Sequence, residues 1–329
     1  PRNFCCVGGR WPLRLPGCVA GASSAAAPQL AGWRLRTRTR AAGSAGSAIL
    51  GWRPRDNSAL PQWLAARNGS TSFSDIPIFR VEDLQTSLFH DALWTQRPFI
   101  LRGCLDLTAL QDTLGRGRLL EAAEQLNLSA KIGHSWTITR NGGEGPETLP
   151  LREFLSERMH QPWYDGETLL EPAYAFDMGL DLPGAPVVHD LPVLGEAWSA
   201  AASQMPGPTN RITMLGAAES AVGWHRHGMA VQMTVHGSKR WLLYPLGRYP
   251  PGDGPGGGFS ISDWLRVVYP TLTSDRAPLE CIQEPGDAIF VPAGWYHAVV
   301  NLADSVAVSE QQTGLPAGCD DPFKGISLG

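Results

Sequence analysis

Apolar residues from about residue 211 onward fall into short runs that are separated by turn residues. Several of the runs are rich in β-branched and aromatic side chains, which favour strands. They are RITMLGA, TVHGSKRWLLYP, PLECIQE, AIFVP, YHAVVNL and SVAVSEQ. Between two of them, Glu284 to Asp287 (EPGD) has the composition of a tight turn. The pattern therefore predicts a mainly β fold, a sandwich or barrel of the jelly-roll kind.

Before residue 211 the pattern is mixed. Helical spacing predicts helices at 81–96, 117–126 and 149–159, and one more at 261–269 within the later part. RPFILRG, residues 97–103, is a short apolar run closed by a glycine and predicts a buried strand. Residues 162–210 are rich in Pro, Gly and Asp and predict mixed loops. The helices that precede the strands are expected to flank the β core.

Charge divides the chain into a basic start and an acidic body. Residues 1–55 contain nine arginines, no lysine and no acidic residue. Because the whole chain has a net charge of −4, residues 56–329 carry −4 − 9 = −13. Nucleic-acid binding needs a basic face that neutralises phosphates, so this balance argues against nucleic acid as a partner of the body. A protein or peptide partner is compatible with it.

The start of the chain has the composition of a leader. It is rich in Arg, Ala, Gly and Ser, which is typical of an organelle transit segment, and a signal peptide is the other interpretation. Its longest uncharged stretch contains prolines and is too weakly apolar to span a membrane. We expect a disordered or targeting leader over 1–70, one domain over 76–312 and a tail over 313–329. Within the domain, a helical and mixed part is expected over 76–210 and the β core over 211–312.

Three histidines in the β part are candidate metal ligands. Residues i and i+2 of a strand point to the same face, so His225 and His227 would project side by side. His297 begins a later strand, and two strands of one barrel could bring the three imidazoles together. Two histidines at this spacing are more often ordinary polar residues than ligands. The spacing alone therefore leaves both interpretations open.

Lys239 is a candidate anion-binding residue. It alternates with Trp241 and Leu243 onto one face of a predicted strand, which would draw its ammonium group inward among apolar side chains, where it would need an anion. The alternative is a lysine whose side chain extends to the surface. Ser309 could donate a hydrogen bond to the same anion, although a hydroxyl near the end of a strand is common.

The order of these motifs resembles the JmjC domain of the cupin superfamily. The shared features are His-x-His, Gly-x-Lys-Arg-Trp with a strand that ends in Tyr-Pro, Pro-Gly-Asp, an aromatic-Val-Pro step, and Gly-Trp-Tyr-His followed by Asn-Leu-x-Asp-Ser. RPFILRG and LREFL also have counterparts in JmjC hydroxylases, so the resemblance extends from about residue 76 to 312. WLRVVYP (264–270) and APLEC (277–281) narrow it to one subgroup of that family.

The resemblance implies a double-stranded β-helix, the jelly-roll core of the cupins, that holds Fe(II) and 2-oxoglutarate. In the family pattern a His-x-Asp/Glu pair and a later histidine bind the iron. His225 and His297 occupy the first and last of these positions, and His227 stands where the family has a carboxylate. Lys239 occupies the position that pairs with the distal carboxylate of 2-oxoglutarate.

Two functions follow from this resemblance. The first is a Fe(II)- and 2-oxoglutarate-dependent dioxygenase that hydroxylates a side chain of a protein or peptide substrate. The second is a catalytically inactive JmjC fold that serves as a binding or regulatory module, because imidazole in place of the carboxylate removes a negative charge from the metal site. The subgroup implies the lumen of the endoplasmic reticulum, whereas the leader fits an organelle equally well.

Overall fold

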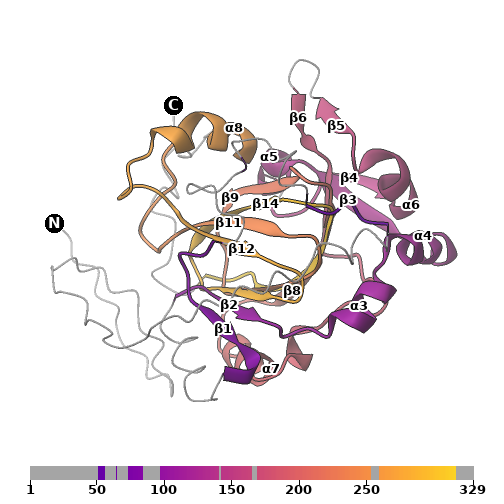
Figure 1. Ribbon diagram of the computed structural model, residues 1–329, viewed down its shortest axis with the longest axis horizontal. Helices are drawn as coiled ribbons and strands as arrows, with labels where there is room; N and C mark the ends of the chain where they lie inside the picture. Colours follow the sequence, from indigo (N-terminus) through magenta and orange to yellow (C-terminus); the bar gives the residue numbers. More distant parts are fainter. Residues whose placement is uncertain are drawn as a thin grey trace.

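The computed structural model describes residues 51–55, 64, 73–83, 97–140, 142–164, 169–252 and 259–315. Their strands form two main sheets that face each other (Figure 1). The larger sheet has the order β1 (Ile78–Arg80), β2 (Phe99–Arg102), β13 (Ala288–Val291), β10 (Ala230–His236), β15 (Ser305–Gln312), β8 (Thr209–Gly216), β7 (Tyr174–Asp177), β3 (Ser129–Gly133) and β4 (Glu147–Pro150). The smaller has the order β12 (Leu279–Gln283), β11 (Lys239–Tyr244), β14 (Tyr296–Asn301) and β9 (Ala221–His225).

Pairing within both sheets is antiparallel, except for the parallel pair β1–β2. A separate hairpin joins β5 (Pro162–Tyr164) and β6 (Leu169–Pro172). The chain crosses between the two sheets. Of four consecutive strands, β10 and β13 lie in the larger sheet, and β11 and β12 lie in the smaller one. The described part of the chain is therefore mainly β-sheet around a jelly-roll core, as the sequence predicts.

Helices flank the two sheets on their outer faces. The α-helices are α3 (Leu107–Thr113), α4 (Arg116–Gln125), α5 (Ser135–Arg140), α6 (Leu151–Glu153), α7 (Leu194–Ala202) and α8 (Ile261–Asp263). The 3₁₀ and π-helical turns are η2 (Val81–Asp83), η3 (Phe154–Arg158), η4 (Val188–Asp190), η5 (Trp264–Val268) and η6 (Tyr269–Thr271). Figure 1 shows α5 and α8 beside the smaller sheet and α7 on the opposite side of the molecule.

The core lies between the sheets because alternate residues of each strand point inward. On β14, Val299 packs with Trp241 of β11 and Ile289 of β13, which belong to opposite sheets. Its neighbours Ala298 and Val300 face outward and pack in the cluster that contains Trp264 of η5. The two faces of β14 thus contribute to two different apolar clusters, which fixes the register of the strand.

Most of the predicted strands and three of the predicted helices are confirmed. The turn at Glu284–Asp287 closes with a bond from the Asp287 amide to the Glu284 carbonyl, and Gly286 has φ +89°. A positive φ at the third position of a turn that has proline at the second is what a type II turn requires. The expected helix over 117–126 is α4, and that over 149–159 is α6 continued by η3. The helix expected over 261–269 is α8 continued by η5.

Two expectations for the first half differ from the structure. Residues 162–210 are more than mixed loops, because they contain the buried strand β7 and the helix α7. β7 is only four residues long and both of its faces are buried, so it lacks the alternation that marks a strand in sequence. Of the helix expected over 81–96, only η2 is described, and residues 84–96 lie outside the described residues. The proposed division of the domain at residue 210 stays a prediction.

A short N-terminal segment lies against the turn between β14 and β15. The Trp52 side chain is 1% exposed and its indole N–H donates to the Leu114 carbonyl at 3.1 Å. The Arg53 amide donates to the Asp304 carboxylate at 2.8 Å, and His160 Nε2 lies 3.0 Å from the same group. This segment closes one end of the core, the end at which β11 begins and β14 ends.

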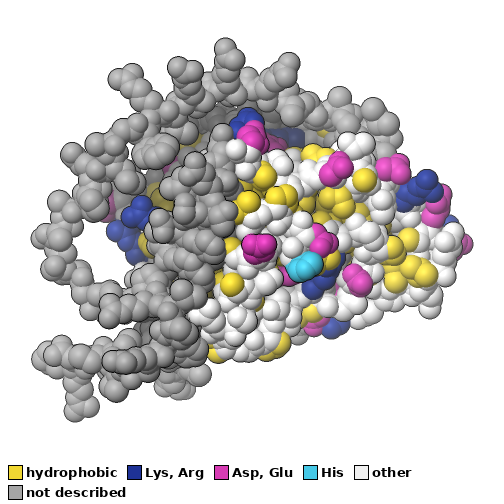
Figure 2. All heavy atoms as spheres, turned by 90° about the horizontal axis from the view of Figure 1, so that it is seen from below, with side chains coloured by type: hydrophobic (Ala, Val, Ile, Leu, Met, Phe, Trp, Pro, Cys, Tyr) yellow, Lys and Arg dark blue, Asp and Glu magenta, His cyan; other side chains and the backbone are white. Residues whose placement is uncertain are grey.

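Two features of the described residues relate to the partners expected from the sequence: the charges on the surface and the composition of the helices. Figure 2 shows acidic and basic side chains interspersed over the described part of one face. Within the described residues, none of the helices combines the length and the apolar composition that crossing a membrane requires.

Candidate metal centre

The structure brings His225, His227 and His297 together at the end of the core where β9 ends and β14 begins. His225 ends β9 and His297 lies in β14, where the two residues are paired across the strands. Their ring centroids are 4.1 Å apart, and the ring of His227 lies 4.8 Å from that of His297 and 5.4 Å from that of His225. One ring nitrogen from each residue lies within 4.8 Å of the others. Three nitrogen ligands could therefore meet at one metal ion.

An irregularity in β9 turns His225 inward. β9 advances three residues, from Val222 to His225, while β14 advances two, from Val299 to His297. Such a bulge changes which face a side chain occupies. Val222 and His225 consequently both face the interior, although their spacing in a regular strand would place them on opposite faces. His227 follows the end of β9 and is not on the strand, so the predicted side-by-side arrangement arises from a strand end and a loop.

Backbone carbonyls fix the orientation of all three imidazoles. Nδ1 lies 2.8 Å from the Gly223 carbonyl in His225, 2.8 Å from the Gly228 carbonyl in His227 and 3.0 Å from the Trp295 carbonyl in His297. A carbonyl only accepts, so each Nδ1 must carry the proton. The lone pair of each ring is then on Nε2, which is the arrangement found in metal-binding histidines.

Burial keeps these rings in the form that binds metal. Desolvation lowers the pKa of His297 well below its ordinary value and, with the charge of neighbouring His225, lowers the pKa of His227 to about 3. Desolvation also lowers the pKa of His225. The three imidazoles are therefore neutral near pH 7, and among the described residues the cluster contains no carboxylate.

Lys239 points into the same interior. Its side chain is 0% exposed, and Nζ donates to the Tyr174 hydroxyl at 2.8 Å and to the Asn301 Oδ1 at 2.6 Å. Both partners are neutral, and within the described residues no acidic side chain forms an ion pair with it. Desolvation lowers the pKa of Lys239 to about 7. A buried ammonium group with neutral partners is the environment in which an incoming anion is stabilised most.

Lys239 and the three histidines lie at different depths of the same interior. Lys239 is paired with Asn301 and Leu243 with His297, so the lysine begins about 13 Å from the metal centre along the strands. Between them, Val299 keeps 6% exposure, whereas the outward-facing Ala298 and Val300 have none. A small dicarboxylate and the lysine's own four-carbon side chain can together span this distance.

Other polar groups of the interior have no partner. The Oγ1 atom of Thr234 and the Nε2 atom of Gln232, both on β10, are buried without a hydrogen bond. Thr234 is paired with Ala307 of β15, and Gln232 is paired with Ser309. Ala307 and Ser309 lie on either side of Val308, which faces outward, so they lie on the inner face of the sheet, as do Thr234 and Gln232. Unpaired buried donors are costly unless a ligand or water satisfies them. They are consistent with a polar ligand in this space.

Ser309 lies on a different wall of the interior from Lys239. Its hydroxyl donates to the Val231 carbonyl at 3.2 Å, and the residue keeps 6% exposure. It is not among the groups that contact the lysine. A shared role of Ser309 and Lys239 in anion binding therefore stays a prediction.

Comparison with known proteins identifies the domain that carries these residues. Residues 204–310 match the family described as "Cupin-like domain". The part of the chain that holds the three histidines and Lys239 therefore matches a cupin-like domain, and relatives of the chain carry JmjC names. The chain is 27% identical over 274 residues to human JmjC domain-containing protein 8. The aligned region covers 81% of the chain and 91% of that protein. This protein represents the subgroup that residues 264–270 (WLRVVYP) and 277–281 (APLEC) predict.

Relatives of the JmjC-type domain include named enzymes. The chain is 26% identical over 263 residues to "Arginine-specific demethylase JMJ22" of Arabidopsis thaliana, across 76% of the chain and 47% of that protein. It is 30% identical over 141 residues to "2-oxoglutarate and iron-dependent oxygenase JMJD4" of Gallus gallus, across 39% of the chain and 31% of that protein. The chain thus spans about half of the first of these relatives and less of the second.

Sequence reasoning missed two residues of the interior. Tyr174 and Asn301 hold the ammonium group of Lys239, yet Tyr174 lies in the segment expected to be loops and Asn301 stands in a motif quoted only for its order. The signal for Asn301 was available, because it is four residues after His297 on one strand and therefore on the same face. Tyr174 gave no such signal, since its strand is not recognisable from sequence.

Proposed function

We propose that the protein is a 2-oxoglutarate-dependent dioxygenase that hydroxylates a side chain of a protein or peptide substrate. The observation that carries the proposal is a pair of features in one interior. One ring nitrogen from each of three histidines lies within 4.8 Å of the others, and a buried ammonium group has no acidic partner among the described residues. The relative named as a 2-oxoglutarate and iron-dependent oxygenase supports the choice of ligands. In the overall reaction, 2-oxoglutarate, dioxygen and a C–H group yield succinate, carbon dioxide and the corresponding C–OH group.

The residues have separate tasks in this proposal. His225, His227 and His297 would hold Fe(II), which when bound would supply the redox chemistry with dioxygen. Lys239 would bind the distal carboxylate of 2-oxoglutarate, and the Tyr174 hydroxyl and the Asn301 amide orient the ammonium group toward it. Trp52, whose side chain is 1% exposed, would help to keep bulk water out of the interior in this proposal.

A second function is favoured by one specific residue. His227 supplies a neutral imidazole where the family pattern has a carboxylate, so the three protein ligands bring no negative charge to the metal. Such a set fits Fe(II) but also Zn(II), which has no redox chemistry. The alternative function is therefore a catalytically inactive JmjC fold that acts as a binding or regulatory module.

An anaerobic titration distinguishes the two functions. Fe(II) and 2-oxoglutarate are added to the metal-free full chain, and the charge-transfer absorption band of an Fe(II)–2-oxoacid chelate is followed. Dioxygen is then admitted and succinate is measured. A saturable band with succinate release supports the oxygenase, and a band without succinate supports the module. Absence of both a band and metal binding refutes the oxygenase and favours the catalytically inactive module.

A further inference from the structure

Two turns meet at the end of the interior that holds the ammonium group of Lys239. One of them, residues 237–238, leads into Lys239. The other, residues 302–304, follows Asn301, which accepts a hydrogen bond from that ammonium group at 2.6 Å. Lys239 and Asn301 are also paired across β11 and β14. Any movement of either turn would therefore move one of these two residues relative to the other.

The two turns are in direct contact. The Leu302 amide donates to the Ser238 carbonyl at 2.8 Å. Gly237 has φ +70°, and a Cβ atom added there would overlap the carbonyl oxygen of Asp304. Glycine alone accommodates both this backbone conformation and this close approach. Whatever holds the turn at Asp304 in place therefore also holds the turn that leads into Lys239.

The N-terminal segment 51–55 is bound to Asp304. The Arg53 amide donates to the Asp304 carboxylate at 2.8 Å, and the Asp304 amide donates to the Arg53 carbonyl at 3.2 Å. His160 Nε2 lies 3.0 Å from both carboxylate oxygens, and the Asp304 side chain is 2% exposed. Because a buried carboxylate needs donors, loss of the segment would leave it short of one and free the turn to move.

Trp52 fixes the same segment beside the second turn. Its side chain is 1% exposed in an apolar cluster that includes Leu114 and Val306, and its indole N–H donates to the Leu114 carbonyl at 3.1 Å. Its ring centroid lies 5.9 Å from that of His236, the residue that precedes Gly237. Loss of the indole ring would therefore leave a cavity next to the turn that leads into β11.

We infer that Trp52, Arg53 and Asp304 form a clasp that positions the Lys239 ammonium group for an incoming anion and keeps water from that end of the interior. They are positioning residues, because they act through the two turns and not on the anion itself. The leader expected over 1–70 overlaps the clasp, so only a leader removed before residue 51 would leave the anion site formed. That the anion is 2-oxoglutarate rests on the proposed function, whereas the position and hydration of Lys239 do not.

The test follows the pKa of Lys239 in the metal-free full chain without a ligand. The chain has three lysines, so ¹³C-lysine labelling gives three Cε signals, and Lys239→Met identifies the signal of Lys239. We expect this signal to titrate near pH 7 in the natural protein, because burial lowers the pKa to about 7. In Trp52→Ala water reaches the ammonium group, and its proton affinity should rise about tenfold or more. If that variant does not fold, Trp52→Phe replaces it, with an expected rise of about two- to fivefold.

Asp304 gives a second test, in which charge and hydration have opposite signs. Asp304→Ala opens the clasp and should raise the proton affinity of Lys239, although loss of a negative charge alone would lower it. Asp304→Asn loses the same charge but keeps an acceptor oxygen and should show no rise. Leu119→Ala is the matched control, because it empties space in the apolar cluster of Trp52 but lies on α4, outside both turns. An unchanged titration in either clasp variant, an equal rise in Leu119→Ala, or a natural Lys239 that titrates near its ordinary value overturns the inference.

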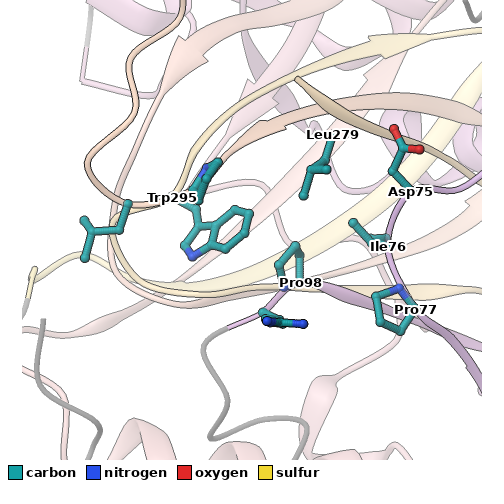
Figure 3. Close-up of a pocket in the computed structure, with 9 residues that line it drawn as sticks. Asp75, Ile76, Pro77, Pro98, Leu279 and Trp295 are labelled. Atoms are coloured by element: carbon teal, nitrogen blue, oxygen red, sulfur yellow. The ribbon is translucent and has the colours of Figure 1, made fainter. Parts of the chain in front are cut away.

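The metal centre lies at the other end of the core and should not respond. Trp295, whose carbonyl accepts the hydrogen bond from Nδ1 of His297, lines a pocket with Leu279 at that end (Figure 3). At about pH 6, where the ammonium group is charged in both proteins, Trp52→Ala should bind 2-oxoglutarate about tenfold more weakly and Fe(II) as well as the natural protein does. Equal losses of both ligands would indicate a general effect on the fold and overturn the inference. A natural protein that binds no 2-oxoglutarate refutes the oxygenase alone, because the titration of Lys239 tests the clasp without a ligand.

Discussion

The imidazoles of His225 and His297 lie with their ring centroids 4.1 Å apart and are paired across β9 and β14, each held through Nδ1 by a backbone carbonyl. The backbone, and not a neighbouring side chain, therefore sets where the two Nε2 lone pairs point. Because the rings are already oriented before a metal binds, binding costs little side-chain conformational entropy.

Removing one of these imidazoles should abolish stable metal binding. We expect the natural protein to retain about one divalent metal ion per chain after dialysis, and His297→Ala to bind at least about a hundredfold more weakly, because two ligands remain. The measurement is metal content by mass spectrometry together with a competition titration. His189→Ala is the matched control, since the His189 side chain is 76% exposed and remote from the cluster. Equal metal content in the two variants would refute the site.

Restoring the carboxylate of the family pattern should separate binding from turnover. His227→Asp supplies a negative ligand at the position where the chain has imidazole, which favours Fe(II) and the reaction with dioxygen. We expect succinate release with Fe(II) and 2-oxoglutarate to rise about tenfold or more over the natural protein. Activity that appears only in the variant identifies the natural protein as the binding module. A variant that loses both metal binding and succinate release contradicts the assignment of His227 as a ligand.

Binding of 2-oxoglutarate should weaken as the pH rises through about 7. Burial lowers the pKa of Lys239 to about 7 from its ordinary value of 10.5, so the ammonium group that attracts the anion is progressively lost above that pH. Calorimetric titration of 2-oxoglutarate between pH 6 and pH 9 checks this. Lys239→Met is expected to bind weakly at every pH. An affinity that does not change with pH in the natural protein would mean that Lys239 stays charged or does not contact the ligand.

The lowered pKa of Lys239 should also make the free energy of unfolding depend on pH. Between about pH 7 and pH 10.5 the unfolded chain holds a proton on Lys239 that the folded protein has lost, so the free energy of unfolding rises with pH across this window. Relative to Lys239→Met, the ligand-free natural protein should gain about 1–3 kcal/mol between pH 7 and pH 9. Urea denaturation at several pH values measures it, and a constant difference between the two proteins would contradict it.

The sequence predicts the second half of this fold better than the first, for a physical reason. Strands such as β8 and β15 are long and rich in β-branched residues, and turns such as Glu284–Asp287 carry their own conformational signal. β7 is short and buried on both faces, and α7 begins after Val193, which has φ +62°, without a side-chain cap. Neither has a local signal, because tertiary packing determines them.

For the candidate site, the residue types were predictable and their geometry was not. The i, i+2 spacing of His225 and His227 would place both on one strand, but β9 ends at His225. The bulge that turns His225 inward depends on the pairing with β14, which is not encoded locally. Lys239 was expected to point inward from alternation together with the motif around it, and alternation is reliable there because β11 is a central strand of its sheet.

A buried ion pair beneath the helical turns of the smaller sheet should be the most sensitive charged site for stability. The Arg240 guanidinium donates to the Glu280 carboxylate at 2.8 Å and 3.1 Å, with side-chain exposures of 1% and 3%, and the Tyr269 hydroxyl donates to the same carboxylate. Glu280→Gln leaves the guanidinium charge buried without its counter-charge. We expect a loss of about 3–5 kcal/mol in the free energy of unfolding.

The control for this prediction is an exposed pair with the same residue types. Arg118 and Glu121 lie 3.6 Å apart with exposures of 64% and 63%, and Glu121→Gln should change the free energy of unfolding by less than about 1 kcal/mol. Removing both buried charges in Arg240→Met with Glu280→Leu should recover most of the loss, because the penalty comes from the unpaired charge and not from the missing attraction. Urea denaturation of the three variants decides it: equal losses for Glu280→Gln and the double variant would show that packing, and not charge, determines stability at this position.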